Sequence, residues 1–194
     1  MEYVSFEETI GVYDGDQSVV DSCLSYVYDL QKVCPESDGN SNYGGWQKDI
    51  DHPIKEVILR EFKQYMKHYM VEEPYWVDFT KLFCNINPTG ASNTMHHHTV
   101  GEFSGAFWLK ADENSGDLIV MNPYPNKMIN TCTIAKRDYN AMYFTPQSNR
   151  GLFFNSNLIH YVDVNRSHED RVSCLLYTSP SPRDDPLSRM PSSA

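Results

Sequence analysis

The fold is indicated most clearly by the stretch Gly151-Leu152-Phe153-Phe154-Asn155-Ser156-Asn157-Leu158-Ile159-His160-Tyr161-Val162. An apolar run is followed by three short polar residues, Asn155 to Asn157, whose side chains favour turns. A second apolar run with a histidine within it comes next. This order predicts a strand, a turn and another strand.

Similar short runs of β-branched and aromatic residues recur from residue 76 onward, separated by turn-forming residues. They lie at 79–86, 103–110, 117–121, 131–135, 151–154, 159–164 and 171–176. Upstream, apolar residues repeat at three- and four-residue steps over 16–33 and 51–69, which predicts two helices. The sequence therefore predicts a mainly β fold, an antiparallel sandwich or barrel, with N-terminal helices packed outside it.

We expect one structural domain followed by a tail. A helical part, 1–75, is expected to pack on a β core, 76–176. The last residues, 177–194, contain five Ser and four Pro but no Val, Ile, Phe or Trp, which predicts disorder. The wording of residues 176–184, Leu-Tyr-Thr-Ser-Pro-Ser-Pro-Arg-Asp, also resembles translated adapter or vector sequence. We therefore expect the natural gene product to depart from this chain near Ser173 or Cys174, which resequencing of the genomic junction tests.

The chain of 194 residues is acidic and rich in aromatic residues. Its 16 Lys and Arg against 26 Asp and Glu give a formal net charge of -10, and aromatic residues make up 13%. This charge argues against nucleic acid or an anionic membrane as the partner. No apolar run reaches the roughly 18 residues that span a bilayer, and the N-terminus lacks the pattern of a signal peptide. The composition predicts a folded protein; the family resemblance given below implies a small-molecule or peptidyl substrate.

Five cysteines are spread along the chain without a CxxC pair, at 23, 34, 84, 132 and 174. Their odd number and wide spacing predict buried reduced thiols rather than a disulfide framework or a zinc site. Cys84 and Cys132 are expected to pack within strands, without His or Cys nearby. Reduced thiols indicate the cytoplasm.

Three of the seven histidines are consecutive, at His96, His97 and His98. On a strand, His96 and His98 point to one face, where an H-x-H pair offers two imidazole ligands to a metal. The alternative is a polar loop in which the histidines have no common function. A third candidate ligand is His160, although a lone histidine of this kind is commonly a satisfied core or turn residue.

Arg171 follows His160 by 11 residues and begins an apolar run. A guanidinium that enters an apolar strand needs an anionic partner, because an unpaired buried charge is costly. That partner is either a nearby Asp or Glu, or the carboxylate of a ligand held in bidentate fashion beside the Ser173 hydroxyl.

These motifs, taken in order, resemble the 2-oxoglutarate- and Fe(II)-dependent oxygenase family of marine phages and bacteria. The resemblance covers roughly residues 40–173. It rests on H-x-H at 96–98, Ser104–Leu109, Ser115–Val120, Gly151–Ser156 with His160, and Arg171-Val172-Ser173, with upstream signatures at Ser41–Gln47 and Asn85–Gly90.

The resemblance implies a double-stranded β-helix, or jelly roll, with iron at one open end. His96 and His160 match the two histidine ligands of iron, and Arg171 matches the anchor for the distal carboxylate of 2-oxoglutarate, with Ser173 beside it. His98 stands where the wider superfamily has a carboxylate, so that Glu102 or Asp117 is the alternative third ligand. Asn85 is a further candidate contact for the co-substrate.

The reaction implied is oxidative decarboxylation of 2-oxoglutarate by O2, giving succinate and CO2 and a hydroxylated substrate, in a bacterial or phage-infected cell. Five aromatic residues are candidates for pocket walls or for plain core: Phe107, Trp108, Tyr143, Phe144 and Phe153. Two other functions compete with this one. One is a cupin-like jelly roll that uses Zn, Mn or Ni, and the other is a jelly roll with a structural or binding role only.

Overall fold

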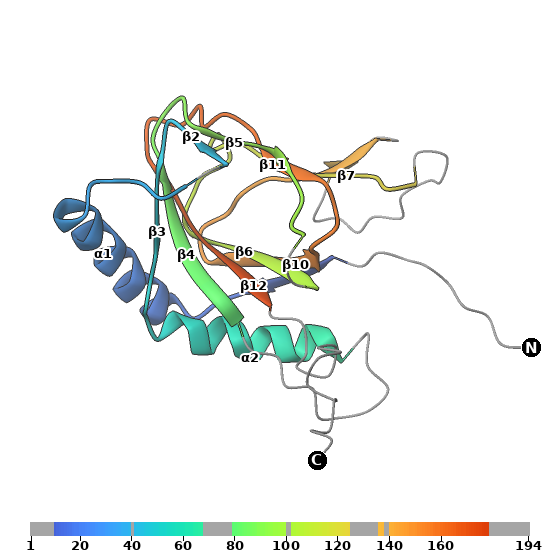
Figure 1. Cartoon of the computed structure of the whole chain (residues 1–194), viewed down its shortest axis with the longest axis horizontal. Coiled ribbons are helices and arrows are strands. Elements are labelled where there is room, and N and C mark those ends of the chain that lie inside the picture. The colour runs from blue at the N-terminus through green and yellow to red at the C-terminus, as the bar shows by residue number, and fades with distance from the viewer. Residues whose placement is uncertain are drawn as a thin grey trace, which may run out of the picture.

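The computed structural model describes residues 10–39, 41–67, 79–99, 102–124, 136–137 and 140–178. Within these ranges, two six-stranded antiparallel sheets face each other (Figure 1). The first sheet has the order β1 (Gly11–Asp14), β10 (Arg150–Asn155), β6 (Phe103–Lys110), β12 (Arg171–Thr178), β4 (Phe79–Asn87) and β3 (Trp46–Asp49). The second has the order β2 (Asn42–Tyr43), β5 (Ser92–His96), β11 (His160–Val162), β7 (Leu118–Met121), β9 (Ala141–Phe144) and β8 (Lys136–Arg137).

The predicted mainly β fold with N-terminal helices is confirmed, and the arrangement is a double-stranded β-helix. Strands that are neighbours in a sheet are mostly far apart in the sequence. For example, β12 lies between β6 and β4 near the centre of the first sheet. Residues of both sheets meet in one apolar cluster, which includes Trp108 and Phe154 from the first sheet and Val120 and Phe144 from the second. The space between the sheets is therefore filled by side chains.

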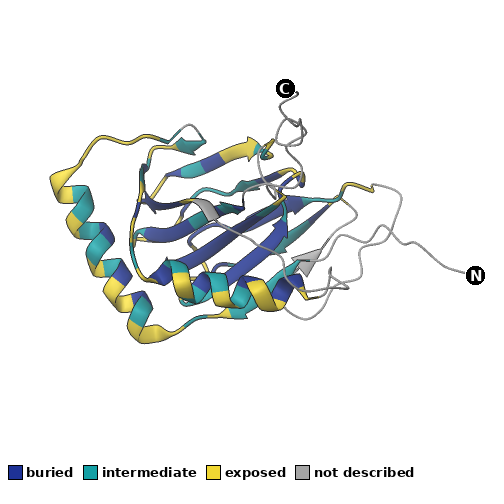
Figure 2. Cartoon of the chain, turned by 60° about the horizontal axis from the view of Figure 1, so that its bottom comes forward, coloured by how far each residue is buried: buried dark blue, intermediate teal, exposed yellow. Residues whose placement is uncertain are grey.

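Two helices cover the outer face of the first sheet (Figures 1 and 2). Helix α1 (Gln17–Val33) begins after Asp16, whose carboxylate accepts a hydrogen bond from the Ser18 N–H at 3.0 Å. Helix α2 (Ile54–Met66) begins after Pro53, whose missing N–H costs nothing there. Each helix buries one apolar stripe against the sheet, as its three- and four-residue spacing predicts, and exposes the other face.

Strand β12 separates the helix side of the first sheet from its inner side. Val172, Cys174 and Leu176 join the core cluster that contains the helix residues. Because successive side chains of a strand point to opposite faces, Arg171 and Ser173 point toward the second sheet. The alternation thus directs the predicted co-substrate residues into the jelly roll.

The structure differs from the sequence-based expectation in several elements. The N-terminal part also supplies β1, β2 and β3, which are too short to show a periodic pattern. Strands β5 and β9 lie outside the predicted runs, because β5 is mostly polar and β9 is an apolar run of only four residues. The strand predicted at 131–135 lies outside the described residues. Of the tail 177–194, Tyr177 and Thr178 continue β12, and the remainder lies outside the described residues.

The described cysteines partly follow expectation. Cys23, Cys84 and Cys174 are buried and unbridged, whereas Cys34 is exposed. Cys132 lies outside the described residues. Among the helices that the structure describes, none is long and apolar enough to cross a membrane.

Candidate metal centre

Three histidines from two neighbouring strands of the second sheet and a connecting segment converge on one another. His96 ends β5 and lies directly opposite His160, the first residue of β11. His98 lies just beyond β5, where its N–H donates to the Ser156 carbonyl at 2.9 Å. The candidate ligand atoms of these three imidazoles all lie within 4.8 Å of one another. This spacing is suitable for binding a single metal ion.

The orientation of each imidazole is fixed through its Nδ1 atom. His96 Nδ1 lies 2.6 Å from the Thr94 carbonyl oxygen, and His160 Nδ1 lies 2.7 Å from that of Leu158. A carbonyl only accepts hydrogen bonds, so both Nδ1 atoms carry the proton and both Nε2 atoms present a lone pair. His98 Nδ1 lies 2.6 Å from Ser104 Oγ, which is itself 2.8 Å from Ser156 Oγ. Such second contacts are what orient histidines that bind metals.

Two of the Nε2 atoms are buried without a hydrogen-bond partner among the described residues, those of His98 and His160. Burial, together with the neighbouring imidazoles, lowers the pKa of His98 to about 3. Burial also lowers the pKa of His160 to about 4. Both rings are therefore neutral near pH 7, which is the form that binds a metal.

The surroundings of the three histidines are partly aromatic. The ring of Phe154 lies 4.9 Å from that of His160, and the ring of Tyr177 lies 4.2 Å from that of His98, measured between centroids. Of the predicted wall residues, Trp108 and Phe144 belong to the inner cluster, whereas Phe107 and Phe153 pack on the helix side. Phe154, not Phe153, is thus the aromatic residue beside the site, because strand alternation turns its neighbour away.

No carboxylate joins the three histidines among the residues that the structure describes. Glu102 and Asp117, the alternative third ligands, are not part of any such group. The described donor set is therefore three neutral imidazoles, in place of two imidazoles and one carboxylate.

Arg171 is buried, with 1% of its surface exposed, and its hydrogen bonds go to neutral groups. It donates through Nη1 to the carbonyl oxygens of Ser115 and Asp163, the latter at 3.1 Å, and through Nη2 to Asn93 Oδ1 at 3.2 Å. Burial lowers its pKa to about 10, an effect that the Asp163 carboxylate partly opposes. The Asp163 carboxylate itself pairs with Arg166 at 3.1 Å. Within the described part of the chain, Arg171 thus has no ion pair.

Ser173 and Asn85 lie opposite each other on β12 and β4, and both are buried. Asn87 lies opposite Arg171 in the same register. The Oδ1 atoms of Asn85 and Asn87 are buried without a hydrogen-bond partner among the described residues. The inner face of this strand pair therefore carries a buried cation and two incompletely bonded amides.

The sequence analysis missed the residues that support these groups. Ser104 and Ser156 hold His98, and Asn93 holds Arg171. Ser104 could have been noticed, because it alternates with Ala106 and Trp108 and is thus a polar residue on an inward strand face. The contacts of Ser156 and Asn93 depend on pairing between distant segments, which a single sequence does not reveal.

A pocket of about 590 Å³ is bounded partly by His96. Its other walls come from β3, β4, β5, β12 and the segment before β2, and include Gln47, Lys48, Asp49, Lys81, Thr94 and Tyr177. Most of these side chains are polar or charged. The pocket thus offers hydrogen-bonding groups next to the histidines.

Comparison with known proteins supports the interpretation of this site. Residues 81–176 match the family described as "Putative 2OG-Fe(II) oxygenase". No curated protein sequence shows a significant match.

Several solved structures share the fold. One is a prolyl-4-hydroxylase from Pseudomonas putida (TM-score 0.65, 12% identity, covering 89% of this chain and 92% of that chain). Another is the viral collagen prolyl hydroxylase of Paramecium Bursaria Chlorella virus-1 in its 2OG complex (0.59, 11%, 87% and 94%). A third is HygX from Streptomyces hygroscopicus with nickel and 2-oxoglutarate bound (0.59, 12%, 88% and 82%). Residues 81–176 thus match the 2OG-Fe(II) oxygenases, the family that the sequence motifs resemble.

Proposed function

We propose that the chain binds Fe(II) through His96, His98 and His160, binds 2-oxoglutarate through Arg171, and hydroxylates a substrate that enters the pocket beside His96. The observation that carries the proposal is the convergence of three imidazoles, two of whose buried Nε2 atoms have no partner within the described residues. A buried nitrogen lone pair that lacks a hydrogen bond is costly, and coordination to a cation removes that cost.

The donor set fits iron, since imidazole is a suitable ligand for Fe(II) as well as for Zn, Cu and Ni. Three neutral ligands leave the charge of the divalent ion uncompensated by the protein. This charge favours a dianionic co-substrate over a neutral one. The presence of His98 in place of a carboxylate ligand therefore affects co-substrate binding as well as metal binding.

Arg171 supplies the second charge that a dicarboxylate needs. Its three hydrogen bonds use three of the five N–H groups of a guanidinium, which leaves two for a carboxylate. Ser173 and Asn85 lie beside it on the same inner face, where they can donate to the same carboxylate once the Asn85 amide turns its nitrogen inward. The Asp163 and Ser115 carbonyls hold the guanidinium in place before the co-substrate arrives.

Fe(II) bound here supplies the activation of O2 that couples decarboxylation of 2-oxoglutarate to oxidation of a C–H bond. The protein orients the three imidazoles through their Nδ1 contacts and directs the co-substrate carboxylate toward Arg171. The inner apolar cluster, with Phe154 against His160, limits the access of water to the site. The polar pocket beside His96 fits a hydrogen-bonding substrate, either a small molecule or a peptidyl side chain. The cysteine usage supports a cytoplasmic setting for this reaction.

Formation of succinate from 2-oxoglutarate, measured with Fe(II), ascorbate and O2, tests the proposal without knowledge of the substrate. We expect slow, Fe(II)-dependent succinate formation by the parent chain, and loss of it in His160→Ala and Arg171→Ala. His97→Ala and Arg166→Ala are matched controls, because His97 is outside the triad and the Arg166 side chain is 64% exposed. A parent that is folded and loaded with iron yet forms no succinate contradicts the proposal and favours a metal-binding jelly roll of other chemistry.

A further inference from the structure

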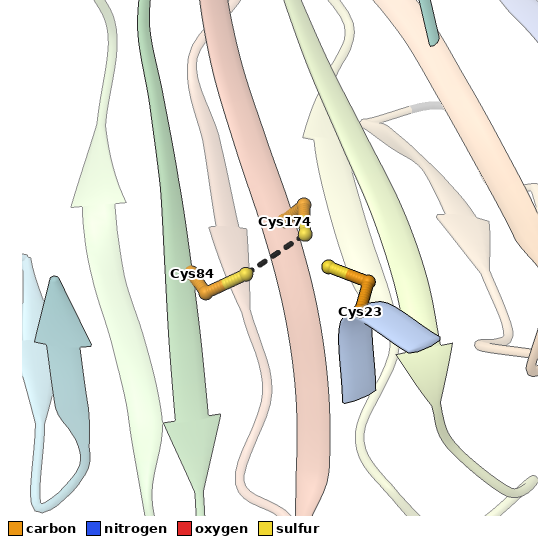
Figure 3. Close-up of side chains that lie close together, drawn as sticks. All are labelled: Cys23, Cys84 and Cys174. Carbon is orange, nitrogen blue, oxygen red and sulfur yellow. Dashed lines mark hydrogen bonds between the residues drawn. The ribbon is translucent and has the colours of Figure 1, made fainter. Parts of the chain in front are cut away.

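Three cysteines meet on the helix side of the first sheet, away from the histidines (Figure 3). Cys84 on β4 lies directly opposite Cys174 on β12, and Cys23 reaches them from α1. Their sulfur atoms lie within 4.8 Å of one another, and all three residues are fully buried. The sequence-based expectation that Cys84 has no cysteine nearby is therefore wrong, since strand register and helix packing bring two others to it.

The cluster has the properties of a ligand site more than of plain apolar packing. Cys84 Sγ and Cys174 Sγ lie 2.8 Å apart, at hydrogen-bonding distance. The three sulfur atoms are close enough together to contact one ion placed between them. The thiolate, and not the thiol, is the form of cysteine that binds a metal, so that binding of an ion releases thiol protons.

No fourth ligand completes the cluster within the described residues. The imidazole of His52 acts electrostatically on Cys23, but both of its nitrogens contact other groups. His52 Nδ1 accepts from the Ile54 N–H at 3.1 Å, and His52 Nε2 lies 3.4 Å from Ser22 Oγ. Structural zinc sites take four ligands, so three sulfurs alone point to a different ion.

We propose that Cys23, Cys84 and Cys174 form a three-coordinate site for a soft monovalent cation, Cu(I). Soft sulfur ligands select Cu(I), and three sulfur atoms are the donors that the cluster offers among the described residues. The ion would bridge α1 to the two central strands β4 and β12. On those strands, Asn85 and Ser173 are the next residues and face the opposite side of the sheet, so that the ion lies directly behind the proposed co-substrate groups.

Cys174 lies where the natural gene product is expected to depart from this chain, so the proposal concerns the chain as it stands in this sequence. A gene product without Cys174 would retain two of the three sulfur donors. Because the site shares no residue with the histidine centre, its occupancy can be tested separately from the oxygenase activity.

The test is anaerobic titration of the reduced chain with Cu(I) against a chromophoric Cu(I) chelator, followed by X-ray absorption at the copper edge. It uses the His96→Ala/His160→Ala background, which removes the competing imidazoles. We expect one Cu(I) per chain with three sulfur neighbours. Cys23→Ala should weaken binding by more than about 100-fold, the upper end of what loss of a supporting group costs a metal site. Cys34→Ala, at the exposed cysteine, should leave the affinity unchanged.

Fewer than three sulfur neighbours, or nitrogen and oxygen neighbours, would overturn the proposal. So would equal Cu(I) affinity in Cys23→Ala and Cys34→Ala. A Cys84–Cys174 disulfide in the chain as purified under reducing conditions, detected as a mass lower by two hydrogens, would also overturn it, because the donors would then be consumed. Circular dichroism checks that Cys23→Ala is folded. If this variant is unfolded, the X-ray absorption spectrum of the chain with all three cysteines decides whether copper has three sulfur neighbours.

Discussion

Replacing Arg171 by Met should remove the preference of the site for a dicarboxylate. The substitution keeps an unbranched apolar stem but deletes the guanidinium of a residue that is 1% exposed and has no ion pair among the described residues. Truncating one partner of a buried, hydrogen-bonded charge pair costs about 2–5 kcal/mol. Because each 1.4 kcal/mol is a factor of ten, 2-oxoglutarate binding should weaken by at least about 30-fold.

Comparing two ligands separates the carboxylate contact from general damage to the site. Pyruvate has the same 2-oxo acid group as 2-oxoglutarate but lacks the distal carboxylate. Anaerobic titration of the Fe(II)-loaded chain should give a ratio of dissociation constants, pyruvate over 2-oxoglutarate, of about 30 or more. In Arg171→Met the ratio should fall to near one, whereas Arg166→Met should retain it. Equal weakening of both ligands in Arg171→Met would refute the assignment, because the arginine would then act only through the shape of the fold.

Three further predictions follow from the supporting contacts. Gly116 has φ +86, and a Cβ there would collide with the Asp163 carbonyl oxygen, so Gly116→Ala should lower the free energy of unfolding by about 1–3 kcal/mol in urea titration. An unchanged midpoint would show that this turn adapts freely. Ser104→Ala removes the partner of His98 Nδ1 and should weaken metal binding about 10- to 100-fold, as measured by competition with a chelator. A metal affinity equal to that of the parent chain would mean that Ser104 does not orient the ring. His98 and His160 have pKa values of about 3 and about 4 in the folded chain, below the ordinary value near 6.5, so the unfolded chain binds more protons in that window. The metal-free chain should therefore be most stable above about pH 7, and its free energy of unfolding should decrease as the pH falls toward about 4. His160→Asn should make this decrease smaller. An equal dependence of stability on pH in the parent chain and in His160→Asn would count against a buried neutral ring at His160.

Much of the fold could be predicted from local pattern. Helix α1 was expected at 16–33, because apolar residues repeat at helical spacing after the capping Asp16, and strand β6 was expected at 103–110, where apolar residues are dense. Strand β5 lacks that density, since Ser92, Asn93 and Thr94 are polar. It is stabilised by pairing with β2 and β11, partners that lie far away in the sequence.

The candidate metal-binding histidines could be predicted from the sequence, whereas most of the residues that hold them in place could not. The H-x-H pair and the distal His160 were identifiable because histidine spacing carries chemical information. His98 converges with the others although β5 ends at His96, since its position depends on the Ser156 carbonyl and Ser104. The cysteine cluster was missed for the same reason: β4, β12 and α1 meet only through tertiary packing.

The most direct test of the central claim is anaerobic titration of the chain with Fe(II) and 2-oxoglutarate, observed in the visible spectrum. Chelation of Fe(II) by the 2-oxo acid gives a weak metal-to-ligand charge-transfer band, which needs neither O2 nor the substrate. The account predicts that the parent chain shows this band, that Arg171→Ala weakens it and His160→Ala abolishes it, and that His97→Ala preserves it. A folded, iron-loaded parent chain without the band would contradict the assignment of this site to 2-oxoglutarate.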